Sequence, residues 1–437
     1  MLVSFSISNF MSIGSKQTIS MVPSLQKSKG THLITIQEMT LLKHAVIFGA
    51  NSSGKSNFIK AMALGKQIIM EGISSKFKHA YSKLGQDDNP RITTWEYTFY
   101  IDNHFFTYGF SANLNTNHID EEWLLEINPK SDRSKFIFER DVQKQELICN
   151  LKTDKSSQKR LLTYINDVKE NSQVLFLSEI NHHKHLDNEL QVFLLAYQWF
   201  EKHLQIRIDE SPSEKTGFFD EQYQKQFLNV ISEFDTGIEG ISLQSLSWDS
   251  FQEQISPQLL NEIRQLELGN FHKFSLRLNN QLYSFQMNDD HHFEVFLVLF
   301  KHQSTPFMFS FNEQSEGTKR IIELVDLLIN AKPNTTYVWD ELDRSIHPLL
   351  TGKYLEKYLE MSEKNNTQLI FSTHETNILS QNRLRRDEVW FMEKGTDQSS
   401  KLYSLDIFKE RLDKKLSTSY LEGQYGGIPN INIKDEQ

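Results

Sequence analysis

The chain has 437 residues, and its 47 basic and 57 acidic side chains give a formal net charge of −10 at pH 7. With 31 Phe, 14 Tyr and 6 Trp it is too aromatic for a disordered chain, and 18 Gly and 9 Pro are too few for a fibrous or low-complexity one. The acidic balance argues against a protein that passively coats nucleic acid. No apolar stretch approaches the roughly 20 residues of a membrane helix, and no signal-peptide pattern opens the chain. Because the single cysteine, Cys149, cannot form an internal disulfide, we expect a cytoplasmic protein with no membrane partner.

The first 150 residues predict strands. Apolar and polar residues alternate over residues 2–8, which favours a half-buried strand, and residues 17–22 form a second candidate. Residues 45–48 are continuously apolar and run into a glycine, which is typical of a buried parallel strand. Between residues 93 and 139, aromatic and β-branched runs separated by turn residues predict an antiparallel meander.

The remainder of the chain predicts helices first and then an alternation of strands and helices. Helical spacing extends over most of residues 154–234, and a hairpin with Asn279 and Asn280 at its turn follows at 271–287. An amphipathic helix is predicted around residues 321–328, and two continuously apolar strands at 337–339 and 369–371.

The strongest chemical signal is the segment 49–56, which fits the phosphate-binding pattern G-x-x-x-x-G-K-[ST] between an apolar strand and a helix-competent segment. Glycines let the backbone N–H groups of such a loop point at phosphate oxygens, and the N-terminus of the helix adds positive potential. Lys55 would reach the β- and γ-phosphates, and the Ser56 hydroxyl would ligate Mg²⁺. The predicted nucleotide-binding residues are Gly49, Ala50, Asn51, Ser52, Ser53, Gly54, Lys55, Ser56 and Asn57.

Two carboxylates, Asp340 and Glu341, follow an apolar strand and form the second element. At the end of the strand Asp340 would hold the Mg²⁺ and its water shell, and Glu341 would polarise the attacking water. A strand that ends in Asp-Glu is common, so this motif supports a nucleotide site only in combination with the other motifs.

Two further elements have a structural and a functional interpretation. Ser315, Glu316 and Gly317 open the amphipathic helix, where they would form either an ordinary N-cap or a second anion site. His374 follows the strand at 369–371 and would be either a satisfied core residue or a contact to the γ-phosphate.

The order of these motifs resembles the ABC-type ATPase heads of the SMC, DNA-repair and OLD-nuclease branch. The Walker A segment at 49–56 is followed by a long insert, a signature at 315–318, a Walker B strand at 337–341, a D-loop with Asp343, and His374 as the H-loop. The opening Ile-Ser-Asn-Phe at 7–10 and the segment 340–348 are similar to this branch. The tail at 420–429 is similar to stand-alone bacterial members, among them the ATPase subunits of PARIS-type and RloA-like anti-phage systems. The signature is Ser-Glu-Gly-Thr where the branch usually has Ser-Gly-Gly-Gln, and no Q-loop is assigned, because Gln86 is the only Gln between Gln67 and Gln143.

The resemblance implies a Mg²⁺-dependent ATPase that works as a head-to-tail homodimer or a higher homo-oligomer. ATP would bind between Lys55 of one copy and the signature residues Ser315, Glu316 and Gly317 of the other, with Asp340 and Ser56 on Mg²⁺ and Glu341 and His374 as catalytic residues. Since the chain ends soon after the head motifs, with no room for a TOPRIM nuclease domain, we expect a sensor and scaffold subunit of an anti-phage complex. A nuclease or toxin effector encoded nearby would be its partner.

Other functions remain to be weighed against this one. A DNA-repair or DNA-clamping ATPase acting directly on duplex DNA is the main alternative, with Lys152, Lys155, Lys159 and Arg160 as candidate contacts. A P-loop kinase or GTPase is excluded by the position of Asp340 and Glu341 far downstream of Lys55 and by the lack of a base-recognition motif between them. The lack of membrane features argues against a transporter.

The predicted fold class is α/β, an ABC-type P-loop NTPase head with an antiparallel β subdomain and a mainly helical insert. Residues 1–145 would form the N-terminal lobe, 146–289 the mainly helical insert, and 290–437 the C-terminal lobe with signature, Walker B and H-loop.

Overall fold

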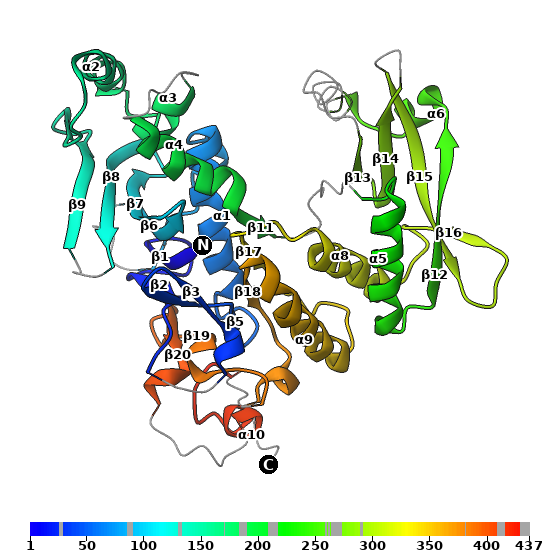
Figure 1. Ribbon diagram of the computed structural model, residues 1–437. Coiled ribbons are helices and arrows are strands. Elements are labelled where there is room, and N and C mark those ends of the chain that lie inside the picture. The colour runs from blue at the N-terminus through cyan, green and yellow to red at the C-terminus, as the bar shows by residue number, and fades with distance from the viewer. Residues whose placement is uncertain are drawn as a thin grey trace. The chain divides into compact units, whose positions relative to one another are not determined.

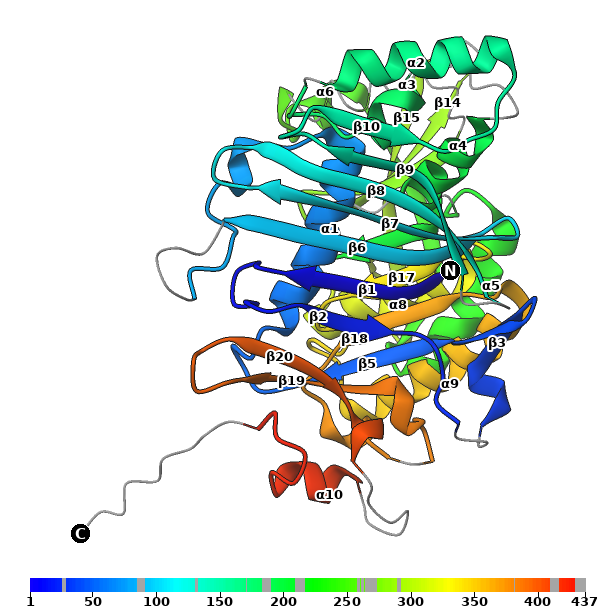
Figure 2. The same ribbon diagram turned by 90° about the vertical axis from the view of Figure 1, so that its left-hand side faces the viewer.

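Figure 1 shows the computed structural model, and Figure 2 shows it turned by 90°. The structure describes residues 1–25, 29–84, 91–129, 133–169, 171–182, 190–208, 217–257, 260, 263, 273–288, 292–380, 382–408 and 416–428. The chain forms two compact units. The first comprises residues 1–208, 332–342 and 359–437, and the second comprises residues 209–331 and 343–358. Among the described residues, no helix combines the length and apolar character that a bilayer crossing requires.

A six-stranded sheet in the first unit contains the apolar strands that the sequence predicts. Its order is β11-β17-β18-β5-β19-β20, and every neighbouring pair is parallel except the pair β19 and β20. All residues of β5 and β18 are buried, as expected for inner strands of a parallel sheet that is covered on both faces. The strands are β5 (His44–Phe48), β11 (Leu204–Arg207), β17 (Thr336–Trp339), β18 (Gln368–Ser372), β19 (Val389–Lys394) and β20 (Ser400–Ser404).

A seven-stranded antiparallel sheet forms the other sheet layer of the first unit (Figure 2). Its order is β10-β9-β8-β7-β6-β1-β2, so the predicted meander over 93–139 is confirmed and is extended by the two N-terminal strands. The strands are β1 (Leu2–Ser8), β2 (Gln17–Ser20), β6 (Ile92–Ile101), β7 (His104–Asn113), β8 (His118–Asn128), β9 (Arg133–Asp141) and β10 (Glu146–Cys149).

Helices and short elements complete the described part of the first unit. The helices are α1 (Lys55–Glu71), α2 (Lys155–Lys169), α3 (Phe176–His182), α4 (Gln191–Gln198), α9 (Pro348–Asn365, shared with the second unit) and α10 (Leu416–Leu421). The short strands are β3 (Leu33–Ile36) and β4 (Met39–Leu42), and the helical turns are η1 (Gly30–His32), η2 (Ser75–Phe77), η4 (Trp199–His203), η6 (Thr376–Ile378), η7 (Arg386–Glu388) and η8 (Leu405–Ile407).

Helix α1 is fixed to the antiparallel sheet by two buried aromatic side chains of β6. The indole Nε1 of Trp95 donates to the carbonyl oxygen of Ala61 at 2.9 Å, and the hydroxyl of Tyr97 donates to the carbonyl oxygen of Met62 at 2.8 Å. A Cβ at Gly65 would lie 2.2 Å from the Tyr97 hydroxyl oxygen, so the close approach of helix and sheet requires glycine there. These contacts fix the axis of the helix whose first turn continues the predicted nucleotide loop.

The second unit consists of helices packed on a separate antiparallel sheet. The order of this sheet is β12-β15-β14-β13, with β16 paired to β15. Helix α5 is tied to α8 by the Tyr223 hydroxyl, which donates to Asp326 Oδ1 at 2.5 Å, and Glu233 pairs with Lys357 at 2.8 Å and Lys353 at 3.4 Å. Its elements are α5 (Glu221–Ile231), η5 (Ser232–Phe234), β12 (Ile238–Leu246), α6 (Trp248–Gln252), β13 (Lys273–Leu278), β14 (Gln281–Met287), β15 (Phe293–His302), β16 (Met308–Ser310) and α8 (Glu316–Asn330).

The stretch 146–289, expected to be mainly helical, is mixed. Its described residues are helical from α2 to η4 and in α5 and α6, but they also form β10, β11, β12 and the predicted hairpin β13–β14. In β12 the register shifts between Ile238 and Gly240, which interrupts the period-2 pattern and obscures the strand in the sequence. The hairpin is confirmed: Asn279 and Asn280 both have positive φ, 47° and 59°, as a two-residue turn of this kind requires. The lobe boundaries at 145 and 290 stay a prediction.

Candidate nucleotide-binding site

The predicted phosphate-binding loop joins the end of the buried strand β5 to the start of α1. Inside this loop the Lys55 ammonium donates to the carbonyl oxygens of Gly49 at 2.8 Å and Ala50 at 3.0 Å, and the residue is only 4% exposed. A buried ammonium needs such partners, because an unpaired buried charge is strongly unfavourable. Asn51 and Ser52 are exposed at the tip of the loop, whereas Ser53 and Gly54 are buried and Ser56 is half-buried.

Two glycines allow the loop to press against the β19–β20 hairpin. A Cβ at Gly49 would lie 2.3 Å from the carbonyl oxygen of Met392, and a Cβ at Gly54 would lie 2.2 Å from Ser400 Oγ. Gly54 also has φ of +113°, a conformation that residues with side chains rarely adopt. The Ser400 hydroxyl donates to the carbonyl oxygen of Ser53 at 2.7 Å, so the loop is held from outside by a distant part of the chain.

Asn57 belongs to the same bracing network. Its side-chain amide donates to Ser12 Oγ at 2.8 Å, and Ser12 Oγ lies within hydrogen-bond distance of Ser400 Oγ, at 2.8 Å. Asn57 was predicted to bind ATP; the structure gives its amide a role in shaping the loop, and the ATP contact stays a prediction.

The predicted Walker B carboxylates lie at the end of β17, next to Ser372 at the end of β18. The Ser372 hydroxyl donates to Asp340 Oδ1 at 2.5 Å, and its oxygen accepts the Glu341 N–H at 2.7 Å. Glu341 has φ of +48°, an uncommon value for a residue with a side chain, which this hydrogen bond helps to hold. One buried serine thus orients both carboxylate residues.

His374 and Glu341 lie on the same edge of the sheet. His374 Nε2 is 3.9 Å from Glu341 Oε1, and both side chains are partly exposed, at 39% and 43%. The loops after β5, β17 and β18 therefore bring together Lys55, Asp340, Glu341 and His374, because these neighbouring strands are parallel and their carboxyl ends share one edge. Ligands of open α/β sheets bind at this edge.

The predicted signature lies in the second unit, at the start of α8. Ser315 is the N-cap: its Oγ accepts the Thr318 N–H at 3.1 Å, which is the structural role foreseen for it. Ser315 and Glu316 are exposed, and Lys319 at 2.8 Å holds the pKa of Glu316 below its ordinary value. A Cβ on Gly317 would lie 2.7 Å from the carbonyl oxygen of Ser345, so glycine is required for the approach of the 343–347 loop. Asp343, the predicted D-loop residue, begins this loop, and its carbonyl oxygen accepts the Ile346 N–H at 3.1 Å.

The residues of the first unit fit a bound Mg²⁺–nucleotide. Ser53 Oγ is buried and has no hydrogen-bond partner among the described residues, and so it is available to a ligand oxygen in the loop. The hydroxyl of Ser56 and the carboxylate of Asp340 are hard oxygen donors of the kind that Mg²⁺ prefers.

The sequence pattern did not identify Ser12, Ser372 or Ser400 as residues of the site. Gln86 lies outside the described residues. A serine in a strand or loop is too common to signal a site. Only the strand order, which puts β18 beside β17 and the β19–β20 hairpin beside the phosphate-binding loop, identifies these three.

Comparison with known proteins assigns a family to this architecture. A family model described as "AAA domain, putative AbiEii toxin, Type IV TA system" matches residues 45–380, whereas no curated protein matches the chain significantly.

Three solved SMC heads are similar at low identity. The SMC head bound to the C-winged helix domain of ScpA has 12% identity and a TM-score of 0.40, covering 92% of this chain and 97% of that chain. The SMC head domain from Thermotoga maritima has 13% identity and a TM-score of 0.35, covering 92% and 98%. The SMC head with an extended coiled coil from Pyrococcus furiosus, bound to the C-terminal domain of ScpA, has 12% identity and a TM-score of 0.39, covering 97% and 98%. Because the family model covers most of the chain, including the phosphate-binding loop, Asp340, Glu341 and His374, the protein belongs to this family of AAA domains and has the P-loop NTPase fold.

Proposed function

We propose that the protein hydrolyses ATP with Mg²⁺ and that two copies pair head to tail around the nucleotide. The observation that carries this proposal is the shared edge of β5, β17 and β18, where the phosphate-binding loop, the carboxylates Asp340 and Glu341, and His374 come together. Phosphoryl transfer depends mainly on positioning and on charge stabilisation, and this edge offers groups for both.

Each group has a defined task in this proposal. Lys55 leaves the carbonyl oxygens of Gly49 and Ala50 to bind the phosphates, and the first N–H groups of α1 point toward the same oxygens. Ser56 and Asp340 hold Mg²⁺, which when bound neutralises charge on the phosphates. Glu341 accepts a proton from the attacking water, and His374, which lies 3.9 Å from Glu341, hydrogen-bonds the terminal phosphate.

The second copy supplies the signature. The start of α8 presents exposed Ser315 and Glu316 and a set of N–H groups with positive helix potential, which suits a phosphate approached from another molecule. Glu316 is an anion at this end, so Lys319, which pairs with it at 2.8 Å, is needed to reduce repulsion of the nucleotide.

The biological role that we propose is a sensor and scaffold subunit of an anti-phage complex that controls a separate nuclease or toxin. Support for it comes from the resemblance of the segment 340–348 to the branch and of the tail at 420–429 to its stand-alone bacterial members. ATP binding would build an assembly that holds the effector, and a phage-derived trigger would release the effector.

A pair of variants tests the ATPase. We expect Lys55→Ala to lose ATP binding and Glu341→Gln to bind ATP and accumulate as a dimer, while its turnover falls about 100-fold or more because the base is lost. Steady-state phosphate release, ATP binding by calorimetry and mass by light scattering measure the three properties. Wild-type turnover by Glu341→Gln would refute the assignment of the base, and full activity in a protein that stays monomeric with ATP would refute the pairing.

Co-expression with the native gene neighbours tests the biological role. Tagged Glu341→Gln should co-purify with one neighbour-encoded protein at fixed stoichiometry. DNA-clamping is the competing function, favoured by the exposed side chains of Lys155, Lys159 and Arg160 on α2. Isolation of a dimer with nucleic acid alone, and ATPase stimulation by duplex DNA that falls steeply with salt, would support that function instead.

A further inference from the structure

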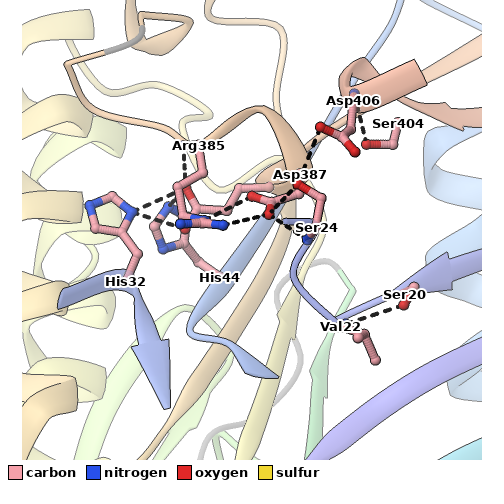
Figure 3. A network of polar contacts seen from close by, with 10 residues as sticks. Ser20, Val22, Ser24, His32, His44, Arg385, Asp387, Ser404 and Asp406 are labelled. Atoms are coloured by element: carbon pink, nitrogen blue, oxygen red, sulfur yellow. Dashed lines mark hydrogen bonds and ion pairs between the residues drawn. The ribbon is translucent and has the colours of Figure 1, made fainter. Parts of the chain in front are cut away.

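A cluster of two histidines and a glutamate lies buried in the first unit, at the amino end of β5 and so at the opposite end of that strand from the phosphate-binding loop. Figure 3 shows the two histidines. His32 ends η1, His44 begins β5, and Glu388 ends η7 directly before β19. Their exposures are 6%, 1% and 0%, and their donor atoms all lie within 4.8 Å of one another. None of the three takes part in the nucleotide site.

The histidines face one carboxylate, but only one of them is hydrogen-bonded to it. His32 Nδ1 lies 2.9 Å from Glu388 Oε1 and 3.1 Å from Oε2. His44 Nε2 lies 3.2 Å from Oε2 without hydrogen-bond geometry, and neither ring nitrogen of His44 has a hydrogen-bond partner among the described residues. A fully buried imidazole whose nitrogens lack well-aligned hydrogen bonds is costly, so a ligand that engages Nε2 would remove part of that cost.

The side chains of the other charged groups around the cluster have hydrogen-bond partners of their own. Arg385 pairs with Asp387 through two hydrogen bonds of 2.9 Å and 2.7 Å (Figure 3). Lys29 donates to the carbonyl oxygen of Leu384 at 3.1 Å. The Arg385 backbone N–H donates to Glu388 Oε2 at 2.6 Å, which fixes the carboxylate in place as hydrogen bonds fix metal-binding carboxylates.

We propose that His32, His44 and Glu388 bind one transition-metal dication of the Zn²⁺ class. Two imidazoles and one carboxylate are donors that suit Zn²⁺ and its neighbours, whereas Mg²⁺ and Ca²⁺ prefer oxygen ligands alone. Metal–ligand bonds of about 2.0–2.1 Å in a tetrahedron place ligands about 3.3 Å apart. The nitrogen–oxygen separations of 2.9–3.2 Å would open slightly to reach this value, and the two histidine nitrogens, which lie within 4.8 Å of each other, would adjust to it as well.

The metal would act as a structural clamp. It would join the segment around His32 to β5 and to the start of β19, two strands that pair in parallel with Val389 opposite Val46. Because β5 carries the phosphate-binding loop at its other end, the clamp would stabilise the strand on which the nucleotide site is built. Burial of the cluster leaves no room for a substrate, so its effect is on stability.

Zinc binding to the intact, nucleotide-free chain tests the proposal. After dialysis against a chelator, Zn²⁺ titrated by calorimetry should bind in a one-to-one ratio and raise the melting temperature. Glu388→Gln keeps the shape and one oxygen but removes the charge, and we expect it to weaken Zn²⁺ binding at least about tenfold. Co²⁺ in place of Zn²⁺ should give the visible absorption of a nitrogen- and oxygen-ligated site in the wild type and lose it in the variant.

An exposed pair of the same chemistry provides the control. His104 Nδ1 lies 2.7 Å from Glu126 Oε1 on the surface, so Glu126→Gln makes the same change outside the cluster and should leave Zn²⁺ binding unchanged. Circular dichroism identifies a variant that fails to fold, and in that event His44→Gln replaces Glu388→Gln. A folded Glu388→Gln or His44→Gln variant with wild-type affinity, or a wild type that neither binds nor is stabilised by Zn²⁺, would overturn the proposal.

Discussion

We expect the substitution Ser372→Ala to lower both the stability and the ATPase turnover of the protein. The Ser372 hydroxyl donates to Asp340 Oδ1 at 2.5 Å and accepts the Glu341 N–H at 2.7 Å, and the residue is fully buried. A hydrogen bond to a charged group contributes about 1.5–3 kcal/mol and a neutral one about 0.5–1.5 kcal/mol, so Ser372→Ala should destabilise the protein by about 2–4 kcal/mol. Since it also releases both Walker B residues, we expect turnover to fall about 10–100-fold, as for other groups that orient metal ligands.

Ser362→Ala is the matched control for this variant. Ser362 on α9 is 1% exposed, and its hydroxyl donates to the carbonyl oxygen of Leu359 at 2.9 Å within the helix. Its loss should cost about 1 kcal/mol or less and should leave turnover unchanged. Urea unfolding followed by fluorescence and phosphate release measure the two effects. Equal stabilities and equal turnover for the two variants would refute the reasoning.

Three further predictions concern the second unit. Gly317→Ala places a methyl group 2.7 Å from the carbonyl oxygen of Ser345 and should cost about 1–3 kcal/mol in urea unfolding; an unchanged midpoint would contradict the close approach. Tyr223→Phe removes the 2.5 Å hydrogen bond to the buried carboxylate of Asp326 and should cost about 1.5–3 kcal/mol, measured in the same way. The pKa of Glu233 is lowered by hydrogen bonds and charges from two lysines of α9, so Glu233 stabilises the fold above its ordinary pKa of 4.5 and loses this effect as the pH falls below it. Because the pair is partly exposed, Glu233→Gln should cost about 1 kcal/mol or less at pH 7 and nothing at low pH, and a constant difference across this range would contradict the assignment.

Local patterns made the fold of the first unit predictable. Continuous apolar runs identified β5, β17 and β18, and the glycine-rich segment between β5 and α1 identified the phosphate-binding loop, because each of these signals lies within one short stretch of chain. The meander β6–β9 was equally local, as was the turn at Asn279 and Asn280 in the second unit. The order of the strands then brought Asp340, Glu341 and His374 together as their sequence positions suggested.

Features that depend on distant segments were not predictable. The bulge near Gly240 conceals β12, and the mixed character of 204–289 follows from pairings that the sequence pattern does not encode. His32, His44 and Glu388 come from three unrelated segments, and each histidine alone has the pattern of an ordinary core residue. Ser372 gains its meaning only from β17, the neighbouring strand.

The bracing of the phosphate-binding loop has a consequence for how the protein is made. The Ser400 hydroxyl and the Ser53 carbonyl that it supports are 347 positions apart, and the strands on both sides of β5 also come from the C-terminal part of the chain. During synthesis the loop leaves the ribosome long before β18, β19 and Ser400, and contacts of such long range form slowly. We therefore expect the braced form of the loop to be absent from a nascent chain until residues 368–404 have been synthesised.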